Sequence, residues 1–212
     1  MEQPTSTGQI IILNGAPRSG KSSIVEVIQR TFDGVWMNLG VDVFVRHVTP
    51  ERYRPGIGLR PGGERPDLEA LVPVFYAAMY ESIRRAQQAG PERCDGRWPP
   101  RRLFHSAQHP HRLPRSLAGL PVLFVGVRCP VEVIMERRNA GQPGREGTYA
   151  TGSSDDDVPE PVRRWQEEIH IPGIYDLEVD TSQLTPEQCA HAIRRGLAGG
   201  PPPRAFQRLA AL

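Results

Sequence analysis

The fold of this 212-residue chain is decided near its start by the stretch Ile10-Ile11-Ile12-Leu13-Asn14-Gly15-Ala16-Pro17-Arg18-Ser19-Gly20-Lys21-Ser22. Its apolar beginning predicts a buried strand, because β-branched and other apolar side chains fill both faces of a parallel sheet. Residues 22–31 then show helical spacing, with Ile24, Val27 and Ile28 on one side. A strand, a glycine-rich turn and a helix are therefore expected to follow one another directly.

The turn from Gly15 to Ser22 matches the phosphate-binding pattern G-x-x-x-x-G-K-[ST] in full. Glycines allow backbone angles at which successive N–H groups point toward phosphate oxygens, and the N-terminus of the following helix adds positive potential. The pattern predicts that Lys21 reaches the β- and γ-phosphates of a nucleotide and that the Ser22 hydroxyl ligates Mg²⁺. The alternative, a glycine turn with a chance lysine, is disfavoured by the strand–loop–helix context. We expect ATP and Mg²⁺ as cofactors, with the nucleotide held by Gly15, Ala16, Pro17, Arg18, Ser19, Gly20, Lys21, Ser22 and Ser23.

Further along, apolar strands alternate with helices, which predicts an α/β fold with a parallel sheet and helices on both faces. The expected strands are 35–39, 121–127 and 177–179, and the expected helices are 67–89, 131–138 and 186–197. We predict one domain over residues 1–198. The Pro-rich tail is placed at residues 199–212: residues 199–204 are expected to leave this domain, and a short terminal helix, whose role is left open, follows them.

Composition limits the cellular setting and the partners. The formal net charge is +2 and the basic residues are spread along the chain, so nucleic acid is not an expected partner. Cys94, Cys129 and Cys189 are odd in number and far apart, without disulfide or metal-ligand spacing, as expected in a reducing compartment. No apolar run approaches the roughly 20 residues that span a bilayer, and residues 1–9 lack the features of a signal peptide. We expect a cytoplasmic protein without a membrane partner.

Several pieces of the chain together resemble the chloramphenicol phosphotransferase-like kinases. The pieces are 11–15 leading into the phosphate loop, Gly40-Val41-Asp42, Phe124 to Cys129, and Tyr175 to Thr181, in the family's order. The resemblance implies a P-loop nucleoside-kinase-like fold with a five-stranded parallel sheet. It also implies transfer of the ATP γ-phosphoryl group to a small-molecule hydroxyl. Chloramphenicol's primary hydroxyl is the namesake acceptor, hence a link to antibiotic resistance. Membership does not fix this chain's acceptor, so a sugar acid, a shikimate-like compound or a nucleoside is an alternative, and a homo-oligomer is left open.

The resemblance also implies roles for single residues. Asp42 takes the position of the general base, where a carboxylate beyond a strand end accepts the proton of the acceptor hydroxyl; a helix N-cap or turn aspartate is the alternative. Arg137 and Arg145 belong to the lid-like segment, placed at about residues 138–160. Each either stabilises the transferring phosphoryl group or is a solvated helix-end arginine. Asp180 and Thr181 take the place of the adenine contacts, with a plain strand-end turn as the alternative.

One segment does not fit this family. A third strand ending in a magnesium-supporting aspartate should follow the helix that stops near Gly90, but residues 91–116 are rich in Pro and Arg and lack apolar alternation. We therefore expect the third strand to be degraded. We hypothesise that residues 90–105 are read out of frame relative to the family, because a one-base shift of permitted codons yields an apolar run ending in aspartate. Asp95 is the fallback magnesium ligand, and His105, His109 and His111 show no metal-ligand spacing. The alternative function is a nucleotide-binding protein with little or no turnover.

Overall fold

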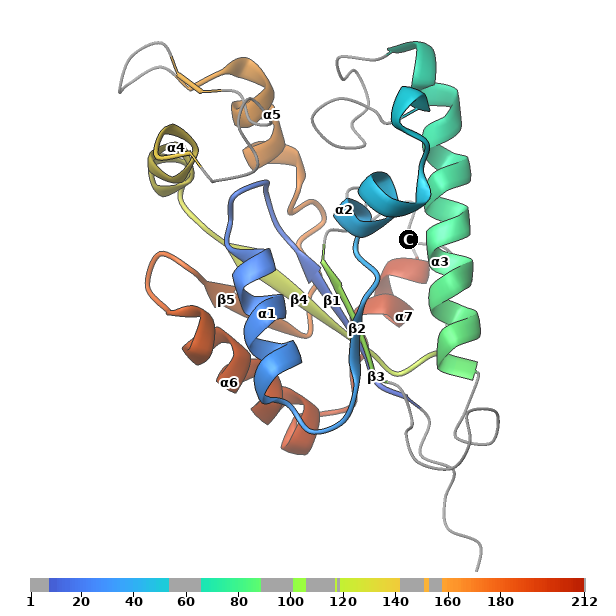
Figure 1. The fold of residues 1–212 in the computed structure, drawn as a ribbon. Coiled ribbons are helices and arrows are strands. Elements are labelled where there is room, and N and C mark those ends of the chain that lie inside the picture. The colour runs from blue at the N-terminus through green and yellow to red at the C-terminus, as the bar shows by residue number, and fades with distance from the viewer. Residues whose placement is uncertain are drawn as a thin grey trace, which may run out of the picture.

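The computed structural model describes residues 8–53, 66–88, 101–105, 117, 119–141, 151–152 and 158–211. They form a five-stranded, all-parallel sheet in the order β2-β3-β1-β4-β5, with helices on both faces (Figure 1). The strands are β1 Ile10–Asn14, β2 Trp36–Asn38, β3 Arg101–His105, β4 Val122–Arg128 and β5 Leu177–Asp180. The α-helices are α1 Lys21–Thr31, α2 Val41–Val43, α3 Val72–Gln88, α4 Val131–Asn139, α5 Glu160–Glu168, α6 Pro186–Gly199 and α7 Ala205–Ala210. The predicted α/β parallel sheet is confirmed.

Strand β1 is the centre of the molecule because its side chains alternate between two apolar cores. Ile11 and Leu13 pack with α1 and α6 on one face of the sheet. Ile10 and Ile12 pack with α3 and α7 on the other. All four side chains are at most 2% exposed, and each such burial stabilises the fold by about 1.5–3 kcal/mol. Both faces of the strand that precedes the phosphate loop are therefore fixed.

The end of the described chain returns to the sheet. Helix α7 packs on the second face, where Ala205 and Phe206 are buried and the Phe206 ring meets the Phe124 ring edge to face at 5.2 Å. The Asp176 carboxylate accepts hydrogen bonds from the backbone N–H groups of Arg204 (2.7 Å) and Ala205 (2.9 Å), which begin this helix, and from the N–H of Phe124. The expectation that residues 199–204 leave the domain is therefore wrong for Arg204, and the short terminal helix, whose role the sequence left open, packs on the domain.

The expectation of a degraded third strand is wrong for residues 101–105. These residues form β3 between β2 and β1, with Leu103 opposite Ile11 and Phe104 opposite Ile12. A parallel ladder is built by backbone N–H and C=O groups, which any residue other than proline supplies in full. The short Pro-free stretch after Pro99-Pro100 is therefore enough to complete the sheet. Asp95, His109 and His111 lie outside the described residues, and the out-of-frame hypothesis stays a prediction.

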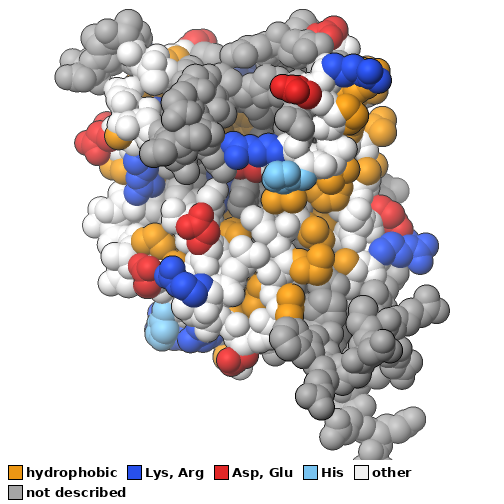
Figure 2. Space-filling model, in the orientation of Figure 1, with side chains coloured by type: hydrophobic (Ala, Val, Ile, Leu, Met, Phe, Trp, Pro, Cys, Tyr) orange, Lys and Arg blue, Asp and Glu red, His pale blue; other side chains and the backbone are white. Residues whose placement is uncertain are grey.

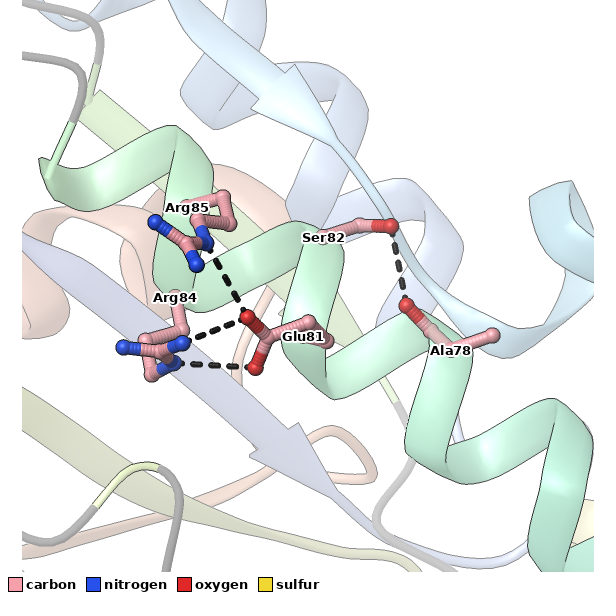
Figure 3. A network of polar contacts seen from close by, with 5 residues as sticks. All are labelled: Ala78, Glu81, Ser82, Arg84 and Arg85. Atoms are coloured by element: carbon pink, nitrogen blue, oxygen red, sulfur yellow. Dashed lines mark hydrogen bonds and ion pairs between the residues drawn. The ribbon is translucent and has the colours of Figure 1, made fainter.

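Helix α3 shows how its inner and outer faces differ. Its inner face buries Met79, Tyr80 and Ile83 against the second core. On its outer face Glu81 pairs with Arg84 and Arg85, and the Ser82 hydroxyl donates to the carbonyl of Ala78 at 2.8 Å (Figure 3). Exposed ion pairs stabilise a protein by about 0–1 kcal/mol, so the buried face holds this helix in place.

The surface and the helices give two further observations. On the face drawn in Figure 2, basic and acidic side chains are interspersed, and neither sign gathers into a single patch. Among the described residues, every helix is too short or too polar to cross a membrane.

Candidate active site

The phosphate loop joins β1 to α1 and is shaped by close packing. A Cβ atom on Gly15 would lie 2.4 Å from the carbonyl oxygen of Val127, so only glycine lets the loop pass this close to β4. Gly20 and Arg18 both have positive φ, +89° and 72°. The Ser19 N–H donates to the Ala16 carbonyl at 3.1 Å and tightens the turn. The sequence thus folds into the expected compact loop between a strand and a helix.

Lys21 is the buried cation of this loop. It is 8% exposed, and its ammonium donates to the carbonyls of Gly15 and Ala16, each at 2.7 Å. The pKa of Lys21 is lowered to about 8, chiefly by burial; the charge of Asp42 partly offsets this shift, and the charge of Arg138 adds to it. The acceptors that the structure gives this ammonium are neutral oxygens. Among the described residues this buried positive charge has no anionic partner in hydrogen-bond range, so it is suited to bind an anion.

The start of α1 offers further groups for an anion. No side chain caps this helix end and its first turn holds no acidic residue, so positive potential at its N-terminus is left for a ligand. Ser22, in the first turn, is partly exposed. Together with Lys21, these features fit the polyphosphate of a nucleotide. The described residues contain no group of three or more His, Cys, Asp or Glu side chains that could hold a metal alone.

Asp42 lies beyond the end of β2, in the short helix α2. Gly40 is the N-cap of this helix, and its N–H donates to the Asn38 side chain at 3.0 Å. Asp42 sits in the first turn after the cap, so it is not the N-cap residue that the alternative interpretation proposed. Its charge raises the pKa of Lys21 and also that of Tyr76 in α3. The structure thus places one carboxylate within electrostatic range of both the loop lysine and α3.

The structure separates the roles of two neighbouring arginines in α4. The Arg137 guanidinium donates to the carbonyl of Thr181 at 2.8 Å, to its hydroxyl at 3.2 Å and to the carbonyl of Arg18 at 3.3 Å. The Arg18 guanidinium in turn donates to the carbonyls of Arg137 and Gly141. Arg137 therefore ties the phosphate loop to the turn after β5.

Arg138, to which the sequence reasoning gave no role, is buried, and its charge acts on Lys21. It is 3% exposed, and its positive charge lowers the pKa of Lys21. The sequence did contain a pattern that indicates burial of Arg138. Residues three and four positions apart lie on the same face of a helix, and residue 138 follows the buried Met135 by three positions and the buried Ile134 by four. The helical pattern of α4 therefore indicates Arg138, and not Arg137, as the arginine that points into the protein.

The predicted adenine contacts divide in the same way. Thr181 touches the loop: its hydroxyl donates to the Ser19 carbonyl at 2.8 Å, and a Cβ on Gly20 would lie 3.3 Å from its methyl group. The Asp180 carboxylate instead accepts from the N–H (2.8 Å) and hydroxyl (2.7 Å) of Ser182, as in a strand-end turn. Arg145 lies outside the described residues, and the lid prediction there stays a prediction.

A buried polar residue lies at the end of β1, directly before the phosphate loop. Asn14 is fully buried, and its amide donates to the carbonyl of Ile169 and to the hydroxyl of Tyr175, both at 2.7 Å. His170 Nδ1 contacts the same hydroxyl at 2.8 Å, and burial lowers the pKa of His170 to about 4. The imidazole is therefore neutral at pH 7, and its tautomer decides which group donates in the contact between Nδ1 and the Tyr175 hydroxyl. The last β1 residue before the loop is held by the segment that leads from α5 to β5.

Comparisons with known proteins agree with this architecture. A family model described as chloramphenicol phosphotransferase-like protein matches residues 8–198. A putative kinase from Chloroflexus aurantiacus superposes with a TM-score of 0.58 at 15% identity, covering 92% of this chain and 98% of that one. Shikimate kinase from Acinetobacter baumannii, solved in complex with shikimate, gives 0.55 at 14% identity, with 90% and 93% covered. A sugar kinase from Janibacter sp. gives 0.54 at 17% identity, with 90% and 94% covered. These likenesses show the fold, and no curated protein sequence matches the chain.

Proposed function

Because the chain belongs to the chloramphenicol phosphotransferase-like protein family, we propose that it is a cytoplasmic, ATP-dependent phosphotransferase acting on a hydroxyl of a small molecule. The observation that carries this proposal is the buried ammonium of Lys21, which donates to the carbonyls of Gly15 and Ala16 in the phosphate loop and on which the charge of Asp42 acts. Phosphoryl transfer to an alcohol needs a base for the hydroxyl proton and positive charge for the phosphates. The site supplies both groups from adjacent elements.

Each role is assigned from the contacts of the side chain. Lys21 exchanges the carbonyls of Gly15 and Ala16 for phosphate oxygens, and the Ser22 hydroxyl is the group available to ligate Mg²⁺. Arg138 adds a second buried positive charge. Arg137 has its donors committed to Thr181 and the loop backbone, so we assign it a positioning role. ATP and Mg²⁺, when bound, supply the phosphoryl group and neutralise charge on the phosphates.

Asp42 acts on the acceptor alcohol. Its carboxylate orients the hydroxyl and takes its proton as the alcohol oxygen bonds to phosphorus and the bond to the ADP oxygen breaks. Chloramphenicol is the acceptor that the family name suggests, and its phosphorylation would confer resistance to that antibiotic. Shikimate and sugar acids are the other acceptors to test, because two of the similar structures are named for shikimate and sugar.

A second candidate function is nucleotide binding with little or no turnover. It is favoured by the sequence of β3, Arg101-Arg102-Leu103-Phe104-His105, which ends without the aspartate that the family places there to support magnesium. The gene sequence across codons 85–120 bears on the same point. If the gene, read one base out of frame across these codons, encodes an apolar run that ends in an aspartate, then this chain differs from a functional relative by a reading-frame change.

The test is a coupled ADP-release assay with Mg-ATP and a panel of chloramphenicol, shikimate, gluconate and nucleosides. Calorimetry measures ATP affinity in parallel. We expect transfer to one acceptor class, loss of ATP affinity in Lys21→Ala, and a roughly 10²–10⁴-fold loss of kcat in Asp42→Asn with ATP affinity unchanged. Asp33→Asn is the matched control, since Asp33 is an exposed carboxylate at the other end of α1. ATP binding without transfer to any acceptor supports the second candidate.

A further inference from the structure

The hydroxyl of Tyr76 is buried but forms no hydrogen bond with the described residues. Tyr76 lies in α3, and its hydroxyl oxygen is shielded from solvent yet has no hydrogen-bond partner in the described structure. Buried tyrosine hydroxyls nearly always find a partner, because leaving one unpaired is costly. An orphan hydroxyl in a kinase-like site is therefore a candidate contact for a ligand.

Asp42 shows where this hydroxyl lies. The pKa of Tyr76 is raised well above its ordinary value, first by burial, then by Tyr80, then by the charge of Asp42. The same carboxylate acts on Lys21. Burial is the single cause that raises the pKa of Tyr80, one helical turn further along α3. The charge of Asp42 thus acts on both Lys21 of the phosphate loop and the Tyr76 side chain.

The side chains that pack near Tyr76 are apolar and only partly buried. Leu39, Phe44, Phe75 and Tyr76 are partly buried side chains that pack against the second core, and they come from the segments around α2 and from α3. Helix α2 stands next to α3 in Figure 1, and Val41 of α2 belongs to the same core as Met79 of α3. A molecule placed here meets an apolar wall and one phenolic hydroxyl beside the proposed base.

We propose that Tyr76 is an acceptor-binding residue that selects alcohols carrying a second oxygen next to the hydroxyl that is phosphorylated. The inference rests on the proposed function. The Asp42 carboxylate binds the reacting hydroxyl. A hydrogen bond donated by Tyr76 to that same oxygen would withdraw electron density from it and oppose attack. The neighbouring oxygen is the chemically compatible partner, so the site is matched to a diol or polyol with an apolar body.

The experiment compares chloramphenicol, a 1,3-diol, with 1-deoxychloramphenicol, which lacks the second hydroxyl. If the wild-type chain uses shikimate or gluconate instead, the same comparison is made with that acceptor and its analogue lacking the neighbouring hydroxyl. In Tyr76→Phe we expect kcat/KM for the diol to fall roughly 3- to 10-fold, and that for the deoxy analogue to stay the same. Tyr80→Phe is the matched control and leaves both values unchanged. Mg-ATP affinity and melting temperature should not fall in Tyr76→Phe, because the hydroxyl has no hydrogen-bond partner among the described residues to lose.

The outcomes separate this inference from the proposed function. Transfer by the wild-type chain with the same diol preference in Tyr76→Phe overturns the assignment of Tyr76 alone. So does an equal loss on both acceptors, which would mark a structural role. Absence of transfer by the wild-type chain to every acceptor overturns the proposed function, and the assignment of Tyr76 with it.

Discussion

Replacing Lys21 by methionine is expected to stabilise the nucleotide-free protein while removing its affinity for ATP. The ammonium is buried beside neutral carbonyls and near the positive charge of Arg138. Methionine keeps an unbranched side chain of similar length without the charge. The substitution therefore separates the stability of the fold from the function of the loop.

The expected magnitude follows from the pKa of Lys21, which is lowered from 10.5 to about 8. One pKa unit corresponds to about 1.4 kcal/mol, so holding the charged form in the fold costs about 3 kcal/mol. In the variant the carbonyls of Gly15 and Ala16 lose their hydrogen-bond donor, which lowers the stability by about 1 kcal/mol or more. This loss offsets part of the stability gained by removing the buried charge. We expect Lys21→Met to be about 1–2 kcal/mol more stable at pH 7. In a protein of this size, each kcal/mol raises the melting temperature by about 2–4 °C.

The pH dependence gives the sign of the effect. Between pH 8 and pH 10.5 the unfolded chain keeps a proton on Lys21 that the folded chain has released. Unfolding takes up a proton in this window, so the stability contributed by this group rises with pH there and is constant below it. The stability difference between the variant and the wild type is therefore expected to be largest at pH 7 and to shrink toward pH 10.5.

Two measurements check this reasoning. Urea unfolding of both proteins at pH 7 and pH 9.5 gives the free-energy difference at each pH. Lys21 is the only lysine in the sequence, so ¹³C-lysine labelling yields one side-chain signal whose titration reports its pKa directly. A pKa near 10.5, or a Lys21→Met protein less stable than the wild type at both pH values, would refute the argument that burial dominates.

Three further changes test separate contacts. Asp176→Ala is expected to lower the free energy of unfolding by about 2–4 kcal/mol in urea titrations, because three backbone N–H groups lose a charged acceptor; a loss no larger than that of Asp33→Ala would mean that α7 is held by its apolar contacts alone. Arg138→Met is expected to raise the pKa of Lys21, read from the single lysine signal, since a repelling charge is removed; an unmoved signal would place Arg138 away from the loop. Thr185→Ala removes the hydroxyl that caps α6, while the backbone N–H of residue 185 can still donate to the Gln188 side chain, and should cost about 1 kcal/mol of unfolding free energy by thermal melts; an unchanged melt would show that this cap is not needed.

The sequence predicted the parts of the fold that local patterns specify. Strand β1, the loop and α1 follow from an apolar run, two glycines and a helical period, all within residues 10–31. The strands expected at 121–127 and 177–179 are found at Val122–Arg128 and Leu177–Asp180. Each is a short apolar segment whose neighbours along the chain already mark its ends.

The parts that could not be predicted depend on contacts between distant residues. Strand β3 carries Arg101 and Arg102, and it is defined by its ladders to β1 and β2 rather than by its own apolar pattern. Helix α7 returns to the sheet because of Phe124 and Asp176, which lie tens of residues earlier in the chain. Likewise, the difference between Arg137 and Arg138 is decided by Thr181, far along the chain in the turn after β5.

The corner where Asn14 meets Tyr175 also bears on how this sequence can evolve. The ring of Tyr175 fills the space above Gly126, where a Cβ atom would lie 2.7 Å from the ring, and its hydroxyl takes one of the two amide protons of Asn14. An alanine at position 126 would fit only with a smaller side chain at position 175. A smaller side chain there would remove the hydroxyl that accepts the hydrogen bond from the Asn14 amide. Descendants of this chain should therefore keep these three positions together or replace them together, and an alignment of its close kin should record them as one co-varying unit.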